Sequence, residues 1–206
     1  MEAINEHESG LLHKIIGITR QLFDAGSEKP TASYQEIRAK LRLQPVFLDR
    51  RRCNFFFPVG SFIRRKLDCG EIYGLYIFHC DGIYVEPSLP ENTFIFTQLH
   101  ELVHATSHPL RLNRIALDEL QEETIALLAT AYLSGAARLP FNEQIMPCEY
   151  YAQLCINEFG DNAQMNNVKN LLCEAIPDAE RAVDYLLNFR GEKSCENFQE
   201  MIIHNG

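Results

Sequence analysis

The five residues His100-Glu101-Leu102-Val103-His104 constrain this chain more than any other segment of its sequence. On an α-helix, side chains at positions i and i+4 lie on one face, about one turn apart. Two imidazoles at this spacing can bind one Zn²⁺ ion, each at about 2.0–2.1 Å. The glutamate beside the first histidine then lies near the open position of the metal, where it can accept a proton from water. The segment therefore predicts a helix that carries part of a zinc site.

The flanking residues favour this interpretation over an ordinary amphipathic helix whose two histidines pack or face solvent. Apolar side chains surround the motif, namely Phe94, Ile95, Phe96, Leu99, Leu102 and Val103. The expected helix is therefore mostly buried, and buried histidine and glutamate side chains need polar partners. A metal ion would supply such a partner.

A catalytic zinc site needs three protein ligands and a water. A third histidine shortly after the motif is excluded, because Ser107 and Leu110 stand where that pattern requires Gly and His. The other common ligand is a glutamate on the following helix, where Glu122 and Glu123 lie 18 and 19 residues after the second histidine. Alternatively, both carboxylates face solvent in the first turn, where they suit the helix dipole.

The remaining sequence predicts an α+β fold with a mainly helical C-terminal half. Helices are expected at about 8–25, 34–43, 117–134, 148–159, 163–175 and 178–189. The segments 71–78 and 82–86, rich in Tyr, Ile and Val, flank an Asp-Gly turn and predict a β-hairpin before the HExxH helix. We expect an N-terminal helical and basic lobe at 1–70, a core domain at 71–190 and a tail at 191–206.

Two basic clusters flank an aromatic run in the N-terminal lobe. The clusters are Arg50, Arg51, Arg52 and Arg64, Arg65, Lys66, and the run is Phe55, Phe56, Phe57. This pattern can bind single-stranded DNA through phosphate contacts and base stacking. The alternative, favoured by the net charge of −9, is a solvated charged face beside a buried Phe strand.

The cysteines and the hydropathy of the chain indicate the cellular compartment in which the protein is expected. The seven cysteines are odd in number and form no CxxC pair, which is typical of reduced thiols rather than disulfides or a cysteine zinc site. No run approaches the ~20 apolar residues of a membrane span, and the acidic N-terminus lacks the features of a signal peptide. We therefore expect a cytoplasmic protein that does not enter a membrane.

The segments HELVHATSHPLRLNR and EETIALLATAYL together resemble the metallopeptidase domain of ArdC-type antirestriction proteins and related polyvalent-protein metallopeptidases. The matching positions are His100, Glu101, His104, Thr106, His108, Arg111, Leu112 and Arg114. A closing helix at 179–187 also looks like that of the family, so the resemblance covers residues 83–188.

The resemblance implies a zincin-like fold with a small sheet packed on the HExxH helix, one Zn²⁺ ion, and hydrolysis of a peptide or protein substrate. It assigns the third zinc ligand to Glu123 and the role of general base to Glu101. Tyr151 or His108 would supply a donor to the oxyanion that forms during cleavage. The family also implies a link to antirestriction or host defence.

Several positions depart from the family pattern. Leu127 stands where the family has an acidic residue that orients a zinc-binding histidine, and Ser107 replaces a glycine. Cys148 and Cys155 stand where the family tends to have His and Trp. The first 80 residues match the family's single-stranded-DNA-binding domain poorly. The alternative function is therefore a catalytically weak or inactive zincin that binds a protein or single-stranded DNA.

Overall fold

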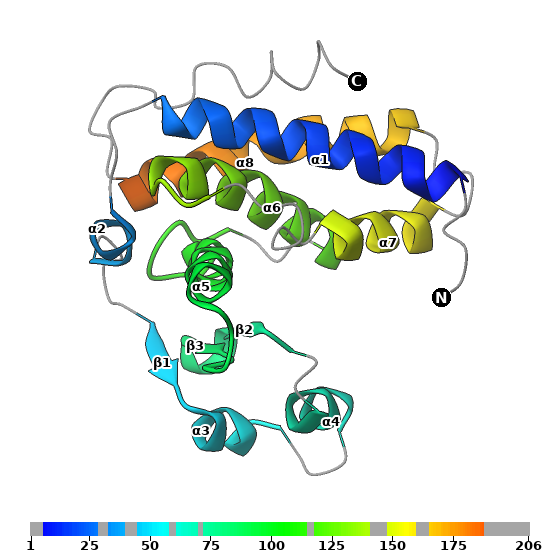
Figure 1. Ribbon diagram of the computed structural model, residues 1–206. Helices are drawn as coiled ribbons and strands as arrows, with labels where there is room; N and C mark the ends of the chain where they lie inside the picture. The colour runs from blue at the N-terminus through cyan, green and yellow to red at the C-terminus, as the bar shows by residue number, and fades with distance from the viewer. Residues whose placement is uncertain are drawn as a thin grey trace.

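The computed structural model describes residues 6–28, 33–39, 45–57, 61–69, 72–114, 118–140, 148–159 and 165–187. Within these ranges the chain is mostly helical and contains a three-stranded mixed sheet, so the α+β class is confirmed at this coarse level. The helical layer consists of α1 (Glu6–Ser27), α6 (Glu119–Ala136), α7 (Cys148–Phe159) and α8 (Met165–Leu187). Figure 1 shows α1 lying along α6 and α8, with α5 (Glu91–Thr106) below them.

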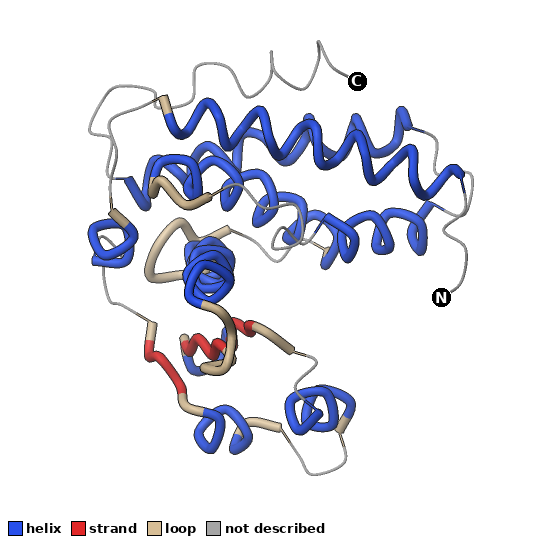
Figure 2. The backbone as a smooth tube through the Cα atoms, in the orientation of Figure 1, coloured by secondary structure: helices blue, strands red, loops and turns tan. Residues whose placement is uncertain are grey.

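The sheet lies on the other side of α5, as Figure 2 shows. Its order is β1 (Val46–Leu48), β3 (Gly82–Val85), β2 (Gly74–Ile77), with β1 parallel and β2 antiparallel to β3. The β2–β3 hairpin confirms the one predicted from the Asp-Gly turn, and a short 3-10 turn, η1 (Phe78–Cys80), joins its strands. The central strand β3 is buried along its whole length because both faces of the sheet are covered.

Two apolar clusters explain this burial. Ile83 and Val85 point toward α5 and join the large core that fills the space among the helices. Tyr84 points to the opposite face and packs with Ile77, Cys53 and Leu67. The last two belong to α3 (Arg50–Phe55) and α4 (Phe62–Cys69), which therefore lie on the face of the sheet away from the helical layer.

Described residues from the N-terminal 70 contact both the helical layer and the sheet. Helix α1 packs against α6 and α7, and β1 pairs with β3, so parts of residues 1–70 belong to both the helical layer and the sheet. Between them, α2 (Tyr34–Ala39) contacts α5 and α8. The predicted tail at 191–206 lies outside the described residues.

Two local predictions are wrong. The Phe55–Phe57 run is not a buried strand, because Arg50–Phe55 form a helix capped by Asp49, and Phe55 is 86% exposed. The two helices expected at 163–175 and 178–189 are one helix, α8, with Pro177 inside it. Proline at an interior position costs a backbone hydrogen bond but does not end a helix that packs along its length.

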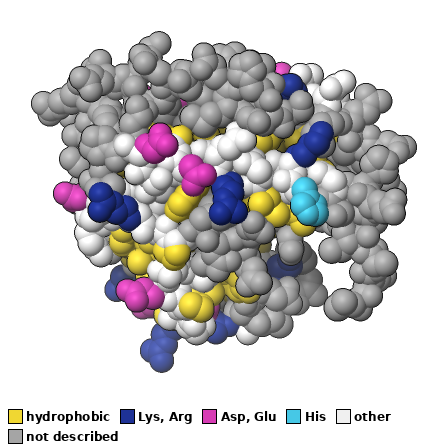
Figure 3. Space-filling view, turned by 45° about the horizontal axis from the view of Figure 1, so that its top comes forward, with side chains coloured by type: hydrophobic (Ala, Val, Ile, Leu, Met, Phe, Trp, Pro, Cys, Tyr) yellow, Lys and Arg dark blue, Asp and Glu magenta, His cyan; other side chains and the backbone are white. Residues whose placement is uncertain are grey.

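The surface carries charges of both signs. On the face shown in Figure 3, acidic and basic side chains of the described residues lie among one another rather than gathering into a single basic stripe. Among the described residues, no helix is long and apolar enough to cross a membrane.

Candidate metal centre

The HExxH residues lie in the C-terminal half of α5, with His100 and His104 on the side that faces α6. The helix begins after Pro90 and ends at Thr106, where the hydroxyls of Thr106 and Ser107 donate to the carbonyls of Val103 and His104. His100 and His104 are one turn apart on the same face, as the spacing predicted. Their rings are in edge-to-face contact, with centroids 4.7 Å apart.

The start of α6 supplies the acidic side chains. Asp118 caps this helix by accepting a hydrogen bond from the backbone N–H of Gln121 at 2.8 Å. The cap fixes the helix start, so that Glu122 ends the first turn and Glu123 begins the second, while every residue from Thr124 to Ala136 is buried. Because α5 packs against α6, these carboxylates come to lie beside the two histidines.

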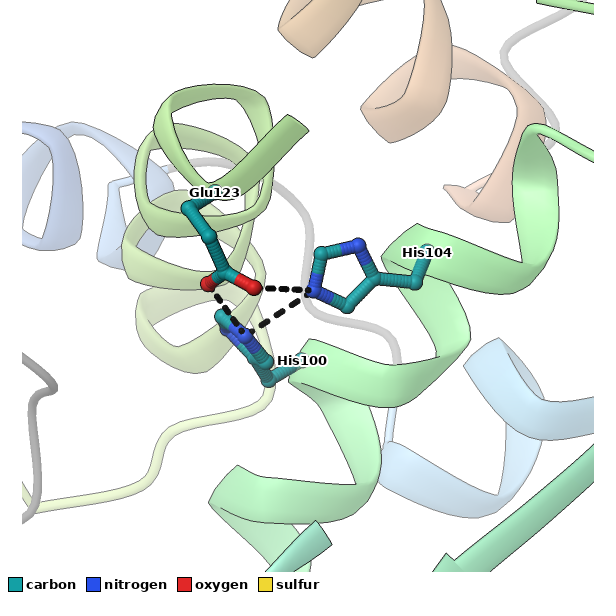
Figure 4. Close-up of side chains that lie close together, drawn as sticks. All are labelled: His100, His104 and Glu123. Carbon is teal, nitrogen blue, oxygen red and sulfur yellow. Dashed lines mark hydrogen bonds and ion pairs between the residues drawn. The ribbon is translucent and has the colours of Figure 1, made fainter. Parts of the chain in front are cut away.

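Figure 4 shows the Glu123 carboxylate between the two imidazoles. Its Oε2 lies 3.3 Å from His100 Nε2, and its Oε1 lies 3.4 Å from His104 Nε2. The two Nε2 atoms are 3.1 Å apart. The site thus brings two imidazole nitrogens and a carboxylate oxygen into a small triangle, and their side chains remain 13%, 15% and 19% exposed.

This triangle fits the donor set of a zinc ion. Ligands at about 2.0–2.1 Å in tetrahedral geometry are separated from one another by about 3.3 Å. The three measured separations of 3.1, 3.3 and 3.4 Å lie close to this value. The partial exposure of all three side chains leaves a side open for a fourth ligand.

Glu123 and the two histidines stabilise one another's charged forms. Burial opposes the charged form of Glu123, but its contacts with His100 and His104 hold the pKa of its carboxyl well below the usual range. Burial likewise lowers the pKa of His104, whereas Glu122 and Glu123 raise it, with a net rise to about 10. Glu123 is therefore held as the carboxylate, the form that binds metals.

Glu101 lies on the side of α5 that faces the sheet and is only 6% exposed. Burial raises the pKa of its carboxyl, against the opposing effect of the adjacent histidines and of a backbone hydrogen bond from Tyr76. Gly74 allows this approach, because a Cβ atom there would lie 2.5 Å from Glu101 Oε1. Sequence reasoning missed Gly74, although a glycine inside a strand is a sign of close approach.

The Glu122 carboxylate contacts other groups than the Glu123 carboxylate does. Its Oε2 lies 3.8 Å from His104 Nδ1 and 3.4 Å from Nη2 of Arg114, a buried side chain. The structure therefore supports the choice of Glu123 over Glu122 as the residue that joins the two histidines. Arg114 was recognised only as part of a family pattern, and its contact with Glu122 had no signal in the sequence.

The two candidate oxyanion donors lie elsewhere. Tyr151 is 1% exposed in the core, where its phenol forms a 2.8 Å hydrogen bond with the Thr124 hydroxyl. His108 lies in the turn after α5, with its ring tilted against that of Phe78 and centroids 5.4 Å apart, and its Nδ1 accepts the N–H of Leu110 at 3.3 Å. Within the described part of the chain, neither side chain forms a hydrogen bond or ion pair with the triangle, so both roles stay predictions.

The predicted nucleic-acid residues lie on α3 and α4, on the face of the sheet away from the triangle. Arg50 donates to the backbone carbonyl of Leu67 and so ties α3 to α4. Arg51 and Arg52 are exposed, next to the exposed Phe55. Lys66 is partly buried and has partners of its own, while the side chains of Arg64 and Arg65 are not described.

No family model, no curated protein and no solved structure matches this chain. The arrangement of the described side chains is therefore the basis on which a function can be inferred.

Proposed function

We propose that this chain is a zinc-dependent metallopeptidase of the zincin type, with His100, His104 and Glu123 as the metal ligands. The observation that carries the proposal is the triangle of Nε2, Nε2 and carboxylate oxygen atoms with edges of 3.1–3.4 Å. Two neutral donors and one carboxylate, open on one side, are typical of a catalytic rather than a structural zinc site.

Bound zinc would supply Lewis-acid chemistry that polarises a peptide carbonyl and acidifies water. The Glu101 carboxylate would accept the proton of the attacking water and deliver it to the leaving amine. Its burial suits this role, because a raised pKa brings a carboxyl closer to the operating pH of a general base. Because Glu101 directly follows His100 in the same helix, the helix fixes its position relative to the two histidine ligands.

The substrate would be an extended peptide that pairs with β2. In the strand order β1-β3-β2, β2 lies at an edge of the sheet. The Glu86 N–H donates to the Tyr73 carbonyl at 2.8 Å, which shows that Tyr73 and every second residue after it face β3. In this antiparallel register the N–H and C=O groups of Gly74 and Tyr76 point away from β3. They lie next to Glu101, so a peptide added to this edge would pass in front of the catalytic carboxylate.

Metal content and cleavage test the two halves of the proposal separately. Wild type should hold about one zinc ion per chain, measured by plasma mass spectrometry, and His104→Ala and Glu123→Ala should lose it. Wild type should cleave members of a random peptide library followed by mass spectrometry. Glu101→Gln should keep the zinc and lose the cleavage, because the amide cannot accept the proton.

One observation favours a second function, a zinc-containing module that binds a partner without cleaving it. Leu127 is buried one turn after Glu123, and the outer nitrogen of His100, Nδ1, is buried without a hydrogen-bond partner among the described residues. A histidine ligand without an oriented outer nitrogen binds metal less firmly. Zinc in wild type without cleavage of any library peptide, and with Glu101→Gln indistinguishable, would establish the binding module and end the peptidase proposal.

A further inference from the structure

Arg114 is a buried cation between the end of α5 and the start of α6. Its side chain is 2% exposed. Its Nη2 donates to the Val103 carbonyl and the Thr106 hydroxyl, both at 3.3 Å, and lies 3.4 Å from Glu122 Oε2. The guanidinium is thus fixed to α5 on one side and holds a carboxylate of α6 on the other.

The same carboxylate oxygen faces His104. Glu122 Oε2 lies 3.8 Å from His104 Nδ1, while the other ring nitrogen, Nε2, faces Glu123 at 3.4 Å. The imidazole is therefore held between two carboxylates, one on each nitrogen. When Nε2 binds a metal, the proton of the neutral ring resides on Nδ1, where Glu122 can accept it.

The two histidines of the triangle differ in this respect. Among the described residues, His100 Nδ1 is buried without a hydrogen-bond partner, whereas His104 Nδ1 faces Glu122 Oε2 at 3.8 Å, just beyond hydrogen-bond distance. Outer partners of this kind orient the imidazole and raise its basicity, and their loss commonly lowers metal affinity by about 10–100-fold. Because the His100 ring lacks such an outer partner among the described residues, the contact of Glu122 with the His104 ring matters more.

We propose that Glu122 and Arg114 act as a positioning pair for His104, and that this pair is the principal outer support of the metal centre. Arg114 fixes the Glu122 carboxylate, and Glu122 fixes the ring orientation of His104. This inference rests on the proposed zinc site and concerns neither the substrate nor the general base.

The test is the affinity for the zinc ion itself, measured by competition with a chromophoric chelator. Glu122→Ala should bind zinc about 10–100-fold more weakly than wild type. Glu122→Gln should lose less, because its amide oxygen can still accept the Nδ1 proton. Glu119→Ala is the matched control, since it removes a carboxylate from the same helical turn, and it should bind zinc within about twofold of wild type.

A double-mutant cycle separates positioning from a merely structural role. Arg114→Lys keeps the charge but loses Nη2, the nitrogen that contacts Glu122, Val103 and Thr106 together. It should weaken zinc binding on its own but add little in the Glu122→Ala background. The unfolding midpoint of each metal-free variant is measured beside the affinity. Glu122→Ala should lower this midpoint, because the buried Arg114 loses its carboxylate, so zinc affinity is measured at a temperature below the midpoint of every variant.

The outcomes are distinct. Zinc bound equally well by wild type and Glu122→Ala overturns the positioning pair and leaves the proposed function intact. Additive effects of the two substitutions on affinity overturn the role of Arg114. No zinc bound by wild type removes the metal centre and this inference together.

Discussion

Tyr150 and Tyr151 are neighbours in the chain and lie in opposite surroundings. Tyr150 is 50% exposed, and its phenol donates to Glu119 Oε1 at 3.4 Å. Glu119 is one turn before Glu123 on α6, so this phenol lies beside the metal centre. Burial and the nearby Glu123 raise the pKa of Tyr150 to about 12, which keeps its proton available for donation.

If the chain cleaves peptides, Tyr150→Phe should lower kcat by about 10–100-fold with little change in KM, because the lost donor acts on the charge that develops during cleavage. Steady-state kinetics on a cleaved library peptide measures this split. Tyr151→Phe is the matched control. It removes the buried hydrogen bond to Thr124 and should cost about 1 kcal/mol of stability with kcat unchanged. The reverse pattern, with kcat lost in Tyr151→Phe, would restore the role predicted for Tyr151.

The sequence identifies the proposed metal ligands more readily than the residues that hold those ligands in place. His100 and His104 follow from helical spacing, and Glu123 follows from the family resemblance, because both rest on short-range patterns. Gly74 and Arg114 act across elements, and their importance depends on how α5 packs on the sheet and on α6. Tyr150 was passed over for Tyr151 because a one-residue shift rotates a helical side chain by about 100°, which no local pattern registers.

At the level of elements, the closest packing is between α1 and α6. A Cβ atom on Gly135 would lie 1.9 Å from the Phe23 carbonyl oxygen, and one on Gly26 would lie 2.1 Å from the Tyr132 carbonyl oxygen. The two backbones therefore touch at this crossing. Since α6 carries Glu123, the contact also sets how firmly the proposed third ligand is held.

Gly135→Ala should therefore destabilise the protein by about 1–3 kcal/mol, as expected for overpacking against rigid backbone. Gly17→Ala, in the exposed face of α1 with no atom within 4 Å of the new methyl group, should stabilise it by about 0.5–1 kcal/mol. Urea unfolding measures both. A neutral Gly135→Ala would show that the helices separate at no cost and that the crossing does not fix α6.

Helices that are marked by short-range sequence patterns were predicted correctly, whereas elements that depend on tertiary contacts were not. Helix α2 begins with a capping box, in which the Ser33 N–H donates to Glu36 Oε2 at 2.7 Å, and α7 has the predicted bounds of 148–159. The Arg50–Phe55 helix was missed because aromatic residues favour strands until a cap such as Asp49 decides otherwise. Likewise, the unbroken α8 depends on packing against α6, which outweighs Pro177.

For the whole molecule, one ion pair joins the sheet to the loop that follows α5. Arg111 donates to both carboxylate oxygens of Asp81, at 2.8 and 2.7 Å, and to the Ala105 carbonyl at 2.8 Å. The Tyr76 phenol donates to the same carboxylate at 3.0 Å. The turn of the hairpin is thereby bonded to the end of the HExxH helix, and this connection keeps β2 beside Glu101.

Stability should depend on pH through Asp81. Burial opposes its charged form, but hydrogen bonds from Arg111 and Tyr76, and the nearby Arg111 and His108 charges, hold its pKa below the ordinary 3.8. A carboxyl with a lowered pKa stabilises the folded state above the unfolded value and loses this effect as pH falls through the folded value. The contribution is therefore complete at neutral pH, begins to fall near pH 3.8, and is lost as the pH falls through the lower pKa of the folded state.

Asp81→Asn isolates this charge, because asparagine tolerates the left-handed backbone that Asp81 adopts at φ 48°. At pH 7 the variant should be less stable by about 1–2 kcal/mol, between the values for surface and buried ion pairs. Urea unfolding at a series of pH values should show the two proteins converging as the pH falls below 4, since protonated Asp81 then resembles asparagine. A difference that stays constant from pH 7 to pH 3 would mean that the carboxylate charge does not hold the hairpin against α5. The position of β2 beside Glu101 would then depend on the apolar packing of Ile83 and Val85 alone.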